Sequence, residues 1–100
     1  MRFLALVHKE PYSCYGVSFP DVHGCTSAGD TLDEALTNAV DALSGHIRLM
    51  ESDGEATPTP RTIEALNSDP DFAEDMKDAI ISAVPLVRNR GFTTRISDKY

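Results

Sequence analysis

The stretch CYGVSFPDVHGCTSAGDT, residues 14–31, decides the fold, because it contains two short strands, a chain reversal and the start of a helix. Tyr15, Val17 and Phe19 alternate with smaller or polar residues, which is the period-two pattern of a half-buried strand. The residues PDVHG at 20–24 favour a reversal, since proline, aspartate and glycine each suit a turn. A second short strand is expected immediately after them, over residues 25–28.

Thr31 and Glu34 have the spacing of an N-terminal capping box, which predicts that a helix begins at Leu32. In such a box the hydroxyl accepts from a helical N–H and the carboxylate accepts from the N–H of the threonine itself. We expect the helix over residues 32–51, with Gly45 marking a close approach to another backbone. One stripe of the helix would pack on the sheet, formed by Leu32, Ala35, Leu36, Ala39, Val40, Leu43, Ile47 and Met50.

The other elements follow from simpler patterns. The apolar run RFLALVH at residues 2–8 predicts a strand in the middle of the sheet, covered on both faces. A turn over residues 9–13 would return the chain, so that three strands form an antiparallel meander. Residues 52–60 indicate an extended connector, and a short helix is expected from Pro60 to Leu66.

Two interpretations are open for residues 72–87, which follow an expected turn at 67–71. Their apolar residues fit helical spacing, but Ile and Val also cluster as in a buried strand. The pattern alone slightly favours the helix, whereas the cluster of Ile and Val, together with a resemblance described below, leads us to predict a strand over 79–86. This strand would lie beside the first strand, with Pro85 on the sheet edge. A right-handed crossover would connect it to the third strand.

Length and composition indicate one small domain with a modest core. The chain has 100 residues, of which 41% are hydrophobic, and no apolar run is long enough for a signal peptide or a membrane span. A cytoplasmic protein is expected. In the predicted hairpin Cys14 and Cys25 would lie about 17 Å apart, so both should be free thiols. His23 is two residues from Cys25, but small buried cysteines are commonly inert.

The charge is unevenly distributed. Residues 1–87 contain five basic and fifteen acidic residues, a net charge of −10, whereas residues 88–100 contain four basic and one acidic residue, a net charge of +3. An acidic body repels nucleic acid and suits a basic protein partner. The simpler interpretation is that the acids only confer solubility.

Four short motifs within residues 19–35 resemble those of a known family. The motifs FPD at 19–21, GC at 24–25, GDT at 29–31 and EA at 34–35 are similar to the signature of the HicB-like antitoxins of bacterial toxin–antitoxin pairs. The resemblance covers residues 1–66. It implies an α+β protein with a small βββαβ sheet and one main covering helix, like a reduced ribonuclease H-like fold, and places a fourth strand within residues 72–87.

The family resemblance also implies the function. HicB-like antitoxins bind and mask HicA, a small basic RNA-cleaving toxin that resembles a double-stranded-RNA-binding domain with a catalytic histidine. The candidate partner-binding residues are acids of the predicted helix and residues of the turn, each of which could equally be plain surface or turn chemistry: Asp21, His23, Asp33, Glu34, Asp41 and Glu51.

An enzyme is the alternative from another class, either a divergent ribonuclease H-like metal-dependent nuclease or a nucleotide-binding protein. Such nucleases use converging carboxylates to hold two cations about 4 Å apart. The first predicted strand contains no carboxylate, and His8, His23 and His46 are too scattered for a metal motif. We therefore expect no catalytic residues, no metal and no cofactor. A structural adaptor without a toxin is a third possibility.

We expect two parts in the chain, an antitoxin core over residues 1–87 and a basic C-terminal segment over residues 88–100. Family members continue into a DNA-binding segment that represses their own operon, but thirteen residues cannot form a two-helix module. The segment is either the approach to such a domain or a tail that contacts phosphates, through Arg88, Arg90, Arg95 and Lys99. Self-association through an exposed sheet edge is also expected.

Overall fold

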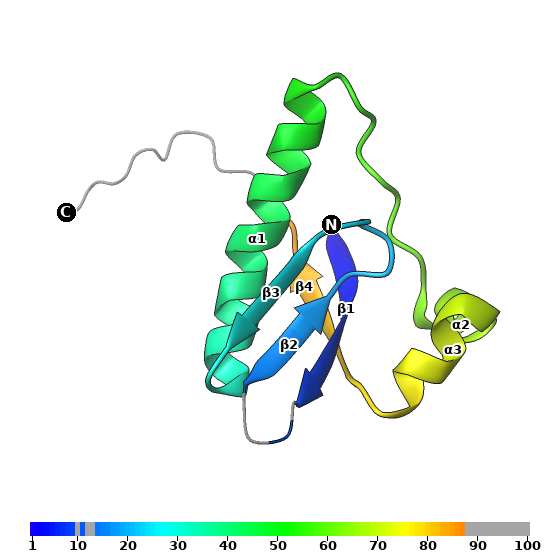
Figure 1. Cartoon of the computed structure of the whole chain (residues 1–100). Coiled ribbons are helices and arrows are strands. Elements are labelled where there is room, and N and C mark those ends of the chain that lie inside the picture. The colour runs from blue at the N-terminus through cyan, green and yellow to red at the C-terminus, as the bar shows by residue number, and fades with distance from the viewer. Residues whose placement is uncertain (10, 12–13, 88–100) are drawn as a thin grey trace.

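The computed structural model describes residues 1–9, 11 and 14–87 (Figure 1). These residues form a four-stranded antiparallel sheet with helices on both faces. The strand order is β3-β2-β1-β4. The strands are β1 (Arg2–Lys9), β2 (Tyr15–Ser18), β3 (Thr26–Gly29) and β4 (Ile80–Pro85). The helices are α1 (Leu32–Ser52), α2 (Ile63–Asn67) and α3 (Pro70–Lys77). The α+β class and the main helix are therefore as predicted.

Strand β1 lies inside the sheet, between β2 and β4, as its apolar run predicts. Phe3, Ala5 and Val7 pack into the core that α1 covers. Leu4 and Leu6 belong to a second cluster on the opposite face, which α2 and α3 cover. Because helices cover both faces of β1, its sequence shows no polar alternation.

Helix α1 begins after Thr31, whose hydroxyl accepts a hydrogen bond of 3.0 Å from the backbone N–H of Glu34. The Glu34 carboxylate accepts from the N–H of Asp30 at 2.6 Å, not from that of Thr31 as the capping box predicts. Thr31 has the extended backbone of a helix N-cap, with φ −121° and ψ 161°. The buried side of the predicted stripe consists of Ala35, Ala39, Leu43 and Ile47.

The close backbone approach occurs at Gly29 and not at Gly45. A Cβ at Gly29 would lie 2.7 Å from the Cα of Ala35, so β3 and the first turn of α1 touch through this glycine. Gly45 is exposed, and a Cβ there would meet no atom within 4 Å. The prediction for Gly45 is wrong because its position falls on the solvent side of the helix.

Residues 72–87 contain both the end of a helix and a strand, so each interpretation is right for part of the range. The helical spacing of Phe72 and Met76 belongs to α3, and the predicted strand is confirmed as β4. The turn expected at 67–71 is present but shorter, since α2 ends at Asn67 and α3 already begins at Pro70. The short helix begins at Ile63 and not at Pro60, because the hydroxyl of the preceding Thr62 caps it.

Strand β4 runs antiparallel to β1 at one edge of the described sheet. Because β3 runs in the same direction as β1, β4 is also antiparallel to β3. The predicted right-handed crossover is therefore wrong, since that rule applies to parallel strands. The connector from α1 returns along the molecule to α2 and α3 before β4 starts (Figure 1). Pro85 lies on the edge strand, as expected.

Two further observations concern the described part of the chain. Cys14 and Cys25 are both free thiols, as predicted. None of the helices within residues 1–87 combines the length and the apolar character that crossing a membrane requires.

Candidate functional site

The turn between β2 and β3 is built by the FPD and GC motifs. Phe19, Val22 and Cys25 are buried and point into the core. The N–H of Val22 donates to the carbonyl of Phe19, and the N–H of Cys25 donates to the carbonyl of Val22, each at 3.1 Å. Gly24 has a positive φ of 83°, a conformation that other residues rarely adopt. The motif therefore fixes the backbone of the turn.

Asp21 connects this turn to α2 and α3 through Arg61. Its carboxylate accepts from the backbone N–H of Arg61 at 2.7 Å and from Nε at 2.6 Å. Nη1 of Arg61 donates to Asp69 at 2.9 Å, and the guanidinium lies 5.4 Å from the centre of the Phe72 ring. We call these four residues the Arg61 network. Because the Asp21 side chain is only 8% exposed, its contact with Arg61 is structural.

The Arg61 network also changes the pKa of two side chains, Arg61 and Asp69. The hydrogen bond to Asp69, together with that to Asp21, raises the pKa of Arg61. The same bond to Arg61 lowers the pKa of the Asp69 carboxyl, with help from the N–H of Asp71. Both shifts favour the charged forms, as expected for an ion pair.

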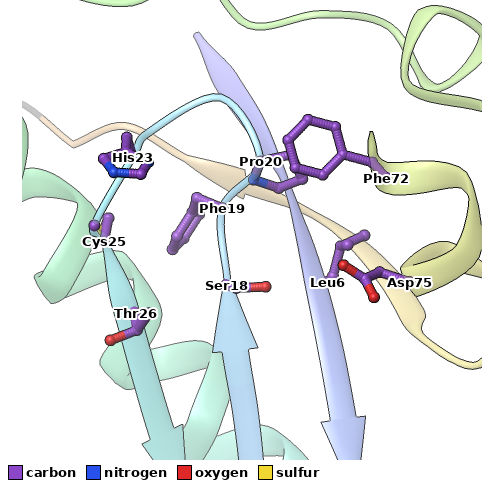
Figure 2. A pocket seen from close by; sticks show the side chains of 10 residues that line it. Leu6, Ser18, Phe19, Pro20, His23, Cys25, Thr26, Phe72 and Asp75 are labelled. Carbon is purple, nitrogen blue, oxygen red and sulfur yellow. The ribbon is translucent and has the colours of Figure 1, made fainter. Parts of the chain in front are cut away.

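A shallow hollow of about 170 Å³ opens beside this turn (Figure 2). Figure 2 shows that its walls come from β1, β2, the turn, β3 and α3, with Pro20 near Phe72 and His23 on the opposite side. Cys25 also lines it, but burial raises the pKa of this thiol. A reactive cysteine needs a lowered pKa, so the hollow is not suited to thiolate chemistry.

The predicted partner-binding residues do not form one cluster. Asp33, Glu34, Asp41 and Glu51 are exposed along α1, spread over about 27 Å at the rise of a helix. Two of them are engaged locally, since Glu34 accepts from the N–H of Asp30 and Glu51 accepts from the hydroxyl of Thr57 at 2.6 Å. His23 is exposed on the turn. A partner would therefore contact only part of this set.

The prediction missed a second acidic surface on α2 and α3. The sequence signal for this surface is the high density of acids in residues 64–78, although the secondary structure of residues 72–78 was open between helix and strand. Its exposed members are Glu64, Asp71, Glu74, Asp75 and Asp78. Within the described ranges, no group of three or more His, Cys, Asp or Glu side chains could hold a metal ion. The candidate nucleic-acid-binding residues Arg88, Arg90, Arg95 and Lys99 lie outside the described residues.

Comparisons with known proteins agree with this architecture. The chain is 47% identical over 70 residues to an uncharacterized 14.9 kDa protein of Haemophilus phage HP1, covering 70% of this chain and 50% of the relative. It is 37% identical over 60 residues to Antitoxin HicB 1 of Photorhabdus laumondii, covering 60% of this chain and 39% of the relative. The chain therefore spans half or less of the length of these relatives.

Solved structures match over most of the chain. The N-terminal domain of Burkholderia pseudomallei antitoxin HicB is 35% identical with a TM-score of 0.71, covering 87% of this chain and 99% of that chain. A chain of a HicA3 and HicB3 toxin-antitoxin complex is 25% identical with a TM-score of 0.69 and the same coverage. Residues 3–96 match the family described as HicB_like antitoxin of bacterial toxin-antitoxin system. The signature turn, the fold and these matches agree, and the chain belongs to the HicB-like antitoxin family.

Proposed function

We propose that this chain acts in the cytoplasm as an antitoxin that binds a basic HicA-type toxin and masks its RNA-cleaving site. The family membership and the similarity to a chain of a HicA3 and HicB3 complex support this proposal. The observation on which it depends is the exposed acidic surface of the described residues. They contain five basic and fourteen acidic residues, a net charge of −9.

Several of the basic side chains are already engaged within the chain, which leaves the acidic surface largely uncompensated. Arg61 is held by Asp21 and Asp69, and Lys77 lies 3.4 Å from Glu74. Lys9 lies over the ring of Tyr15. Surface acids speed the approach of a cationic protein and disfavour acidic ligands such as RNA, so the toxin is favoured over its substrate.

A catalytic role is disfavoured by the sequence of the sheet. None of the four strands contains an aspartate or glutamate, whereas a ribonuclease H-type site needs carboxylates that converge on two metal ions. We infer that masking is steric and electrostatic. Mg²⁺ or Mn²⁺ should leave the melting temperature of the purified chain unchanged, whereas a two-cation site would raise it.

The decisive experiment is a search for a neighbouring reading frame that encodes a small basic protein, followed by co-expression of that protein with this chain. We expect a complex that co-purifies at low salt, dissociates as the salt concentration rises, and suppresses RNA cleavage by the toxin. The double variant Asp33→Lys with Asp41→Lys should weaken the complex with the toxin. Glu64→Lys with Asp78→Lys is the control, because it changes the net charge equally at Glu64 on α2 and at Asp78, the residue that caps the C-terminal end of α3. Absence of a complex at low salt would refute the proposal.

Two further properties belong to this proposal. Self-association is expected through β3, whose residues TSAG include no proline or charged residue that would hinder edge pairing. Light scattering on the purified chain would test self-association, and a monomer at high concentration would contradict it.

Repression of the operon would require the basic segment 88–100 or residues beyond it, and a mobility-shift assay on the promoter would test this.

A further inference from the structure

An apolar hollow of about 280 Å³ lies at the C-terminal end of α1, where this helix meets the β2–β3 turn. Leu49 and Met50 form its apolar part, and Leu49 is 62% exposed, so its side chain is available for contact. His23 comes from the turn and His46 from the helix. A Cβ at Gly24 would lie 3.8 Å from Cε1 of His46, so the turn and the helix are close neighbours here.

The polar rim of the hollow is negatively charged. Asp53 and Glu55 line it, and among residues 1–9, 11 and 14–87 no arginine or lysine lines it or forms an ion pair with either carboxylate. The last turn of α1 contains no basic residue. Since the carbonyl end of a helix already has a partial negative charge, the two carboxylates add to an uncompensated potential that favours a cation.

We propose that this hollow receives a segment of the basic toxin, with an aliphatic side chain against Leu49 and Met50 and a lysine or arginine beside Asp53 and Glu55. The occupant follows from charge complementarity between an acidic rim and a cationic protein. The inference rests on the proposed antitoxin function and makes it more specific. Of the residues predicted from sequence as partner contacts, only His23 lines this hollow.

Two substitutions test the apolar and the charged parts separately. Leu49→Gln keeps a good helix former and removes the apolar contact, and we expect a rise of about tenfold or more in the Kd for the toxin. Glu55→Lys should also raise the Kd, while a cation at this helix end leaves the fold at least as stable. Glu64→Lys is the control, since it makes the same charge change on exposed α2.

Calorimetry should use the full chain and a toxin whose catalytic histidine is replaced by alanine, with urea unfolding of each variant in parallel. Weaker binding by both hollow variants, with near wild-type binding by Glu64→Lys, supports the inference. If wild type binds and both hollow variants bind equally well, the hollow is not the docking site but the antitoxin function stands. If wild type itself does not bind at low salt, both proposals are wrong.

Discussion

At the residue scale, two glycines with different surroundings give opposite predictions. Gly45→Ala should raise the free energy of unfolding by about 0.5–1 kcal/mol, because the site is an exposed helix interior with open space around it. Gly29→Ala should lower it by about 1–3 kcal/mol, since the new methyl group meets the backbone at Ala35. Urea unfolding followed by circular dichroism measures both. Equal effects of the two substitutions would contradict the close approach at Gly29.

A second residue-scale prediction concerns the pH dependence of the Arg61 network. Because Arg61 lowers the folded-state pKa of Asp69 below its ordinary value of 3.8, this carboxylate stabilises the fold above that pH. The stabilisation is lost as the pH falls through the lowered pKa, while Arg61 remains charged throughout. Asp69→Asn should therefore lose less stability than wild type on acidification below about pH 4.

Urea unfolding at a series of pH values checks this difference between variant and wild type. Glu64→Gln is the matched control, since this exposed carboxylate has no ion pair among the described residues. It should follow the wild-type pH profile. An Asp69→Asn profile that also coincides with the wild-type profile would exclude a stabilising contact with Arg61.

At the element scale, α2 and α3 are attached to the sheet by a small apolar cluster. Leu66 is fully buried against Leu6 and Met76. Leu66→Ala should therefore cost about 2–5 kcal/mol of stability, a large fraction of what a domain of this size has. Ile63→Ala, on the same short helix but 38% exposed, is the control and should cost clearly less. Similar unfolding midpoints for both variants would show that α2 does not contribute to cooperative folding.

Sequence patterns predict some boundaries of the helices and strands but not others. The start of α1 follows from Thr31 and Glu34 because capping is local, although the second hydrogen bond goes to Asp30. Only Asp78 and Ala79 separate α3 from β4, and the apolar residues Phe72, Met76 and Ile80 keep helical spacing across that boundary. Periodicity alone therefore could not divide residues 72–87, since short apolar segments fit both a helix and a strand.

At the scale of the whole molecule, the net charge predicts how association with a toxin depends on salt. The association rate constant should fall steeply with ionic strength, because long-range attraction between an acidic body and a cationic partner is screened. The dissociation rate should change less, since contacts in the hollow beside Leu49 are short-range. Stopped-flow measurements at several salt concentrations check both rates. An association rate that is independent of salt would contradict electrostatic steering.

The sequence by itself determined the strand, turn and helix order around residues 14–52 and the acidic character of the body, because these depend on neighbouring residues and on composition. Only the tertiary structure decided which residues meet across long separations. Asp21 contacts Arg61, forty residues away, so an aspartate that sequence suggests for a partner is used within the chain. The same holds for the hollow at the end of α1: His23 and Glu55 come together only when the turn packs against the helix, and no local pattern encodes that contact.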